Sequence, residues 1–246
     1  KCNNTSTKKI ESIIQLYNIE ANFENNKIIA FSTINAIKII NELKKKLNLL
    51  FLSIPQIGLY NKQDLTFPFQ GYGFCIPETQ SIFKDKSPAL TGSIFYEKEN
   101  HIEELNNKLD ASFDNNERSS SHFLSPFIHE MMHNTYLNYI YSKYGYEGKC
   151  PYTKKKYHKN NKNLGLQIMN KLKMLSFSDK ENLIISNILG KYSTISQNQY
   201  HEVFSETFTK IICDSLDGID IVKNPIDILK NMPFEFQKII AKVISL

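Results

Sequence analysis

Residues 127–133 read FIHEMMH and contain the pattern H-E-x-x-H, with His129, Glu130 and His133 at its defined positions. Two histidines four residues apart on a helix lie one turn apart on the same face, so both imidazoles can reach one metal ion. Zn²⁺ binds imidazole nitrogen readily. Glu130 lies at the edge of that face, where its carboxylate can hold an activated water molecule. The pattern predicts a zinc site on a helix; the alternative is a pair of surface histidines on an amphipathic helix.

The helix that carries the motif is expected to begin at Ser125 and to end near Tyr144. Serine is a favoured N-cap, and Pro126 suits the first helical position because its missing N–H has no partner there. Five apolar or aromatic side chains are expected to bury this helix. They are Met131, Met132, Tyr136, Ile140 and Tyr141.

Composition limits the class of protein. The chain has 246 residues, of which 41% are hydrophobic and 22% charged, as in soluble globular proteins. The net charge of +5 comes without a stripe of arginines and aromatics, so no nucleic-acid partner is predicted. No apolar run reaches the length of a membrane span. The four cysteines form no C-x-x-C pattern, which excludes a zinc knuckle and a dense disulfide framework.

Hydrophobic periodicity predicts an α+β protein. The first part of the chain, about residues 1–122, is expected to mix helices with a small sheet, and the second part, about 123–246, to be helical. Helices are expected at 7–18, from a cap at Ser32 or Thr33 to about Leu47, and at 101–109, 164–176, 179–190 and 199–214, with two more from Asn224 and Asn231. Strands are expected at Lys27–Phe31, 49–54, 56–60 and 89–97. A loop with short strands is expected at 61–86, and exposed loops at 110–121 and 145–163, the last of them basic.

A catalytic zinc ion needs a third protein ligand. Glu202 and Glu206 are four residues apart on a helix that is otherwise apolar, and a buried carboxylate needs a partner such as a metal cation. The 69 positions between His133 and Glu202 (202 − 133) leave room for two intervening helices. His201 is the alternative ligand, because only one of two adjacent helical residues can face the zinc ion. Glu202 is favoured, since Glu206 then falls on the same face one turn later.

These two segments together resemble the gluzincin metallopeptidases. The H-E-x-x-H motif followed by a helix with E-x-x-x-E is similar to the pattern of thermolysin and of the anthrax-lethal-factor-like peptidases, over about thirty residues. The resemblance implies a single zincin-like catalytic domain over 1–246, with the active-site cleft between its two parts. It implies that His129, His133 and Glu202 bind Zn²⁺ and that Glu130 is the general base. Glu206 would then orient a liganding histidine.

In lethal-factor-like members a tyrosine that precedes the glutamate ligand stabilises the oxyanion. Tyr192 is the first candidate for this role in the present chain and Tyr200 is the second. The interval between the two motifs is longer than in compact members, which implies an insertion, and residues 145–163 are its expected site. The third histidine of the metzincin motif is absent, because Tyr139 holds that position.

The resemblance predicts a zinc endopeptidase that acts on a peptide or protein substrate. The substrate would bind in extended form along an edge strand, expected at Thr91–Tyr96. The chain begins at Lys1 without methionine, so a signal, leader or tag is expected to have been removed. A secreted bacterial protease, or a toxin or effector delivered to a host cell, would fit the resemblance. Two alternatives stay open: a zinc hydrolase of a non-peptide amide, and a non-catalytic zinc-binding interaction protein whose metal has a fourth protein ligand, such as His122 or His201.

Overall fold

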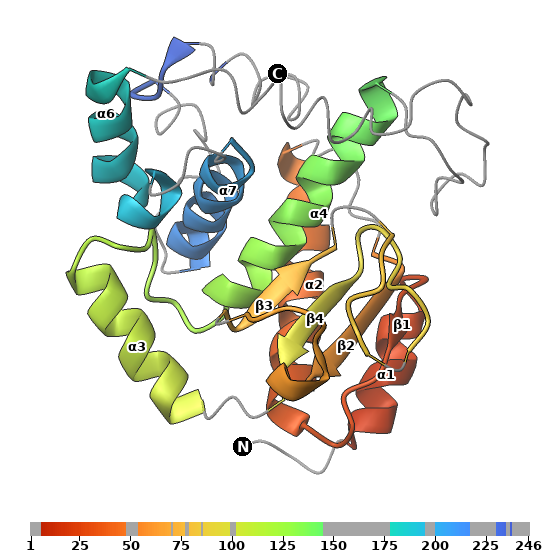
Figure 1. Ribbon diagram of the computed structural model, residues 1–246. Helices are drawn as coiled ribbons and strands as arrows, with labels where there is room; N and C mark the ends of the chain where they lie inside the picture. Colours follow the sequence, from red (N-terminus) through yellow and green to blue (C-terminus); the bar gives the residue numbers. More distant parts are fainter. Residues whose placement is uncertain are drawn as a thin grey trace.

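The computed structural model describes residues 6–47, 54–69, 71–76, 79–84, 86–98, 102–144, 178–194, 200–216, 230–234 and 237. Within these ranges the chain is a mixture of helices and a small mixed sheet, as the sequence predicts (Figure 1). The elements are α1 (Thr7–Gln15), β1 (Glu20–Ala21), α2 (Lys27–Leu47), β2 (Gln56–Tyr60), η1 (Lys62–Asp64), β3 (Gly73–Cys75), β4 (Ile94–Glu97), α3 (Ile102–Asp114), α4 (Ser125–Tyr144), α6 (Asp179–Leu189), η2 (Lys191–Thr194) and α7 (Tyr200–Leu216). The basic loop at 145–163, the helix at 164–176 and the helix from Asn224 were predicted in segments that lie outside the described residues.

The sheet has the strand order β1-β2-β4-β3, with β1, β2 and β4 parallel and β3 antiparallel to β4. Side chains of β4 alternate between its two faces, as in any pleated strand. Ile94 and Tyr96 join the main core beneath the helices, whereas Phe95 joins a second apolar cluster on the other face. The loops between β2 and β4 supply most of that second cluster.

The strand predicted at the sheet edge is in fact internal. β4 pairs with β2 on one side and with β3 on the other, so the expectation that Thr91–Tyr96 is the edge was wrong. The edge strand on that side of the sheet is β3, which comes from the aromatic segment predicted as loop with short strands. A three-residue strand gives too little period-2 pattern to reveal its place in a sheet.

The segment Lys27–Phe31 was predicted as a strand, and this prediction was also wrong. These residues form the first turns of α2, and the predicted caps Ser32 and Thr33 lie inside that helix. The N-terminal cap is instead Asn26, whose Oδ1 accepts a hydrogen bond of 3.0 Å from the backbone N–H of Ile29. The apolar pattern of Ile28 to Phe31 fits a strand or a helix, and the asparagine cap decides for the helix.

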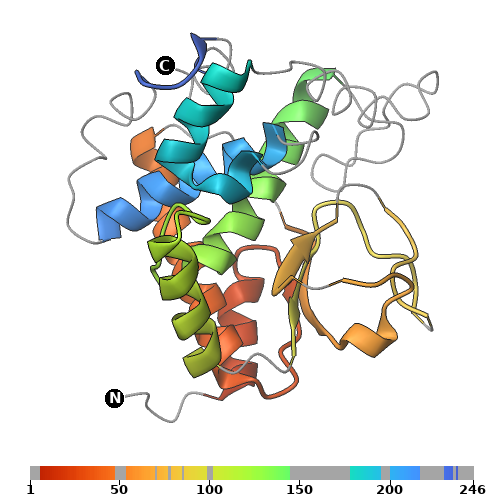
Figure 2. The ribbon, with the colours of Figure 1, turned by 60° about the vertical axis from the view of Figure 1, so that its left-hand side comes forward.

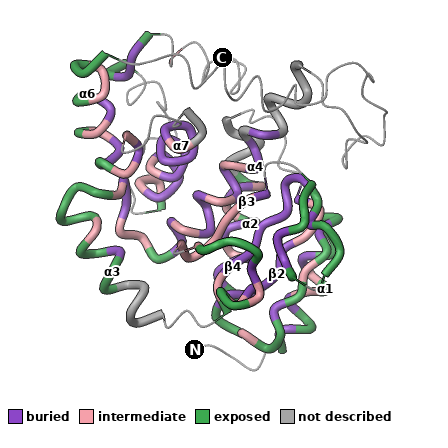
Figure 3. The backbone as a smooth tube through the Cα atoms, viewed as in Figure 1, coloured by how far each residue is buried: buried purple, intermediate pink, exposed green. Residues whose placement is uncertain are grey.

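Helix α4 lies between the sheet and α7, with α2 also packed against it (Figure 2). Its fully buried side chains include Ile128, Met131 and Met132, and the described part of α4 is buried or intermediate in Figure 3. The apolar cluster around α4 contains buried residues from Ile10 near the start of the chain to Met232 near its end. Among the described residues, no helix combines the length and apolar character that crossing a membrane requires.

A backbone clamp joins the end of α3 to the end of α6. The N–H of Lys191 donates to the carbonyl of Asn116 at 2.7 Å, and the N–H of Tyr192 donates to that of Glu117 at 2.8 Å. Helix α6 begins at the predicted capping box of Ser178 and Glu181. It ends at Gly190, whose φ of 85° allows the sharp turn that brings the two segments together.

We expect Gly190→Ala to lower the free energy of unfolding by about 1–3 kcal/mol, because alanine is strained at this positive φ. An added Cβ would also lie 2.6 Å from the carbonyl oxygen of Glu117. Chemical denaturation measures the change. Lys191→Ala is the control, since that exposed residue contributes only its backbone to the clamp and should stay within about 0.5 kcal/mol of the wild type. Equal stabilities for all three proteins would contradict this role of the clamp.

Candidate metal centre

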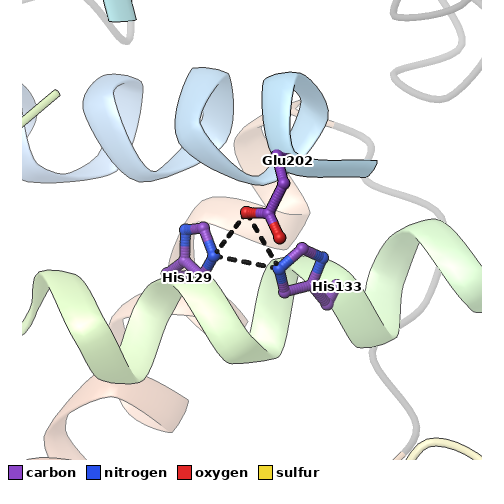
Figure 4. A group of neighbouring side chains, drawn as sticks. All are labelled: His129, His133 and Glu202. Carbon is purple, nitrogen blue, oxygen red and sulfur yellow. Dashed lines mark hydrogen bonds and ion pairs between the residues drawn. The ribbon is translucent and has the colours of Figure 1, made fainter. Parts of the chain in front are cut away.

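Helices α4 and α7 bring His129, His133 and Glu202 together (Figure 4). The two histidines point from successive turns of α4 toward the carboxylate that α7 presents. The Nε2 atoms of the histidines are 2.9 Å apart, and Glu202 Oε2 lies 3.2 Å from that of His129 and 3.5 Å from that of His133. The structure thus brings the three predicted ligands to one point.

The spacing of these atoms fits a tetrahedral metal ion. Ligand atoms that each lie about 2.0–2.1 Å from zinc in a tetrahedral arrangement are about 3.3 Å from one another. The three distances observed here lie on both sides of that value. Two imidazole nitrogens and one carboxylate oxygen also form a donor set of catalytic zinc sites, which leave one position open. The residues therefore fit Zn²⁺, although they do not by themselves identify the metal.

A polar side chain of α7 contacts the Nδ1 atom of each histidine and thereby orients its ring. His129 Nδ1 lies 3.0 Å from Glu206 Oε1, and His133 Nδ1 lies 2.8 Å from Ser205 Oγ. With its proton on Nδ1, His129 directs the lone pair of Nε2 toward Glu202, an arrangement that a proton or a metal cation between the two atoms would stabilise. Although burial disfavours the charged form, Glu202 and Glu206 raise the pKa of His129 to about 10. The site therefore attracts a cation.

Glu206 is the buried carboxylate behind the metal site. Besides His129, it accepts a hydrogen bond of 3.0 Å from Arg118 Nη1 and a short one from the hydroxyl of Ser119. Burial opposes its charge, but His129, Arg118 and Ser119 outweigh burial and lower the pKa of Glu206 to about 2. The structure thus places Glu206 against Nδ1 of His129, where a carboxylate can orient the ring.

Three of these supporting residues were not predicted from the sequence. Arg118 and Ser119 lie in the polar stretch 110–121, which was expected to be an exposed loop, and Ser205 lies between two glutamates on α7. One signal was present in the sequence: Ser205 is three residues after Glu202, so it falls on the same helical face. For Arg118 and Ser119 no local pattern exists, because their partner is 87 or 88 positions away in the chain.

Glu130 lies beside the ligands on α4 and next to the edge strand. The backbone N–H of Cys75 in β3 favours the charged form of its carboxylate. Burial raises the pKa of Glu130 to about 7, partly opposed by the positive charge of His129. A carboxylate with a pKa near neutrality can both accept and deliver a proton.

Of the two candidate tyrosines, Tyr192 is placed by the structure beside the metal ligands. Its ring centroid is 6.2 Å from that of His129. Burial, and next to it the charge of Glu202, raise the pKa of Tyr192 to about 12, so its phenol remains protonated at neutral pH. Tyr200 is the first residue of α7; its side chain, like that of His201, lies outside the described part of the chain.

A cavity of about 550 Å³ opens beside His129. Its wall also includes Glu130, Tyr192 and the edge-strand residue Gly73. Residues of helix α3 and of the segment after it, Arg118 among them, line the cavity as well. His122 is not one of the clustered residues: among the described side chains, only His129, His133 and Glu202 form a group that could hold a metal ion.

No protein-family model, curated protein or solved structure matches this chain.

We expect the wild-type protein to bind about one Zn²⁺ per chain and His133→Ala to lose tight binding, because His133 supplies one of three ligand atoms. Dialysis against zinc followed by elemental analysis, with a competing chelator to obtain the affinity, measures both. His122→Ala removes a histidine outside the group and should bind zinc as the wild type does. Equal zinc binding by His133→Ala would rule out this site.

Proposed function

We propose that this protein is a zinc-dependent endopeptidase of the gluzincin type. The observation that supports it best is the convergence of His129, His133 and Glu202 within 4.8 Å, with Glu130 on the same helix as the two histidines. The three ligands alone would also suit a structural metal site. Glu130 adds a carboxylate that can hold a water molecule at the metal position that no protein ligand fills, and this suits hydrolysis.

The residues of the chain then have distinct tasks in peptide hydrolysis. Zinc, when bound, supplies a Lewis acid that lowers the pKa of water and polarises the peptide carbonyl. Glu130 takes the proton from the attacking water and delivers it to the leaving amine, which its pKa of about 7 allows. The protonated phenol of Tyr192 donates a hydrogen bond to the oxyanion as the carbonyl becomes tetrahedral. Glu206 holds His129 in the orientation that ligation needs.

An extended peptide is the substrate that the surroundings favour. Strand β3 lies at one edge of the sheet, contacts α4, and has Gly73 in the wall of the cavity that Glu130 also lines. A substrate segment could add to this edge by backbone hydrogen bonds and place one side chain in the cavity. Secretion, or delivery into a host cell, is part of this proposal by the family resemblance alone.

The two alternatives make different demands on the site. A non-catalytic zinc protein needs a closed set of ligands, whereas among the described residues the group contains three. Such a protein would also have no use for the carboxylate of Glu130, whose burial disfavours its charged form. A hydrolase of a non-peptide amide would use the same residues, but the edge strand beside the cavity favours a polypeptide.

We expect Glu130→Gln to lower peptide hydrolysis by at least about 100-fold, because general acid–base catalysis is lost while zinc binding remains. Cleavage of a diverse peptide library, read by mass spectrometry, gives the rate, and elemental analysis gives the metal content. Glu20→Gln is the matched control, since Glu20 is an exposed residue of β1 at the far edge of the sheet. A Glu130→Gln protein that cleaves as fast as the wild type would exclude the proposed mechanism.

A further inference from the structure

Arg118 contacts two functional groups that no local sequence pattern connects. Its Nη1 atom lies 3.0 Å from Glu206 Oε1, and its Cζ atom lies 3.6 Å from the centre of the Tyr192 ring. The guanidinium is thus placed over the face of the phenol ring, while one of its nitrogens bonds to the carboxylate. Tyr192 and Glu206 both have a task in the proposed hydrolysis, whereas Arg118 has none so far.

The contact with the ring holds Tyr192 in place more firmly than an apolar neighbour would. A guanidinium over an aromatic ring is attracted by the negative charge of the ring face, and the attraction is stronger where water is partly excluded. The side chain of Arg118 is 32% exposed and that of Glu206 is 3% exposed, so the group lies at the boundary of the core. The ion pair with Glu206 fixes the guanidinium, and the fixed guanidinium restricts the ring.

The backbone supports the same arrangement. Tyr192 donates its N–H to the carbonyl of Glu117, the residue before Arg118, and the turn at Gly190 lets the two segments meet. On the other side, the backbone N–H of Ser119 lies 3.3 Å from Glu206 Oε2. Arg118 is therefore held between two backbone contacts, one toward the tyrosine segment and one toward α7.

We propose that Arg118 is a positioning residue: it holds the Tyr192 phenol beside the metal centre and joins it to the Glu206–His129 pair. The result is one connected array from the tyrosine through Arg118 and Glu206 to the metal ligand His129. A planar guanidinium can stack and bond to a carboxylate at once, whereas a lysine ammonium keeps the charge and loses the stack. This inference rests on the proposed peptidase function.

A double-mutant cycle with Arg118→Lys and Tyr192→Phe tests the coupling. Removing the phenol hydroxyl should lower kcat about 100-fold, the usual effect of losing one oxyanion donor. Arg118→Lys should lower kcat by about 10-fold or more with little change in KM, because it misplaces that donor and removes no substrate contact. In the Tyr192→Phe background, Arg118→Lys should change kcat by no more than about twofold, since the hydroxyl that it positions is already gone. Zinc affinity should stay within about threefold, because lysine can still neutralise Glu206.

A readout that is independent of activity completes the test. In protein labelled with 3-fluorotyrosine, the ¹⁹F signal of Tyr192 is the one that disappears in Tyr192→Phe. This signal should shift and broaden in Arg118→Lys, with the melting temperature close to that of the wild type. Arg118→Gln, which removes the charge but keeps a polar side chain, serves if the lysine variant does not fold.

Three results would overturn the inference. They are an unshifted ¹⁹F signal in Arg118→Lys, effects of the two substitutions on kcat that multiply, and an Arg118→Lys protein with wild-type kcat. If Tyr192→Phe alone leaves kcat unchanged while Glu130→Gln abolishes cleavage, Tyr192 is not the oxyanion donor and Arg118 has no such role, yet the peptidase proposal stands. Zinc-loaded wild-type protein that cleaves no peptide would remove the proposed function itself, and the inference with it.

Discussion

The charge of Glu206 is the constraint on which the architecture around the metal site depends. A carboxylate that is 2% exposed cannot stay ionised in a protein core unless its oxygens are bonded to donors and its charge is balanced. Its partners come from two other parts of the chain: Ser119 and Arg118 from the segment after α3, and His129 from α4. Satisfying one buried charge on α7 therefore fixes two other elements against it.

The same contacts determine the orientation of the metal ligands. Oε1 of Glu206 lies 3.0 Å from Nδ1 of His129. The opposite nitrogen of that ring, Nε2, therefore faces Glu202, which lies one turn earlier on α7. Ser205, between the two glutamates, meets the second histidine in the same way. Buried apolar side chains pack α7 into the core, and polar atoms of α4 and α7 meet at the metal site. Packing sets the distance between the helices, and the polar contacts set the rotation of each ring.

The sequence predicts local features of this molecule well and long-range ones less well. Helical spacing places His129 and His133 on one face of α4, and Glu202 and Glu206 on one face of α7, so each of these faces can be derived from the sequence alone. The capping box at Ser178 and Glu181 is local in the same sense, since its hydrogen bonds span four residues. Arg118 and Ser119 reach their carboxylate only through the fold, and pairing of β3 with β4 depends on how the aromatic segment between β2 and β4 folds back onto the sheet. The apolar pattern of residues 27–31 fits both a strand and a helix. The hydrogen bond that Asn26 accepts as the N-cap decides for the helix.

Two glutamates near the same site have opposite acid–base behaviour, because their immediate surroundings differ. Donors and a guanidinium surround Glu206 and lower its pKa to about 2, whereas burial raises the pKa of Glu130 to about 7. A group of the first kind stays charged and holds its neighbours, whereas a group of the second kind exchanges a proton near neutral pH. Both carboxylates line the cavity: the one that stays charged contacts His129, and the one that titrates lies on the same helix as the two histidines. In the proposed peptidase the second carboxylate handles the proton of the attacking water. A non-catalytic zinc-binding protein would gain nothing from it, and this difference between the two glutamates is the physical reason for proposing catalysis.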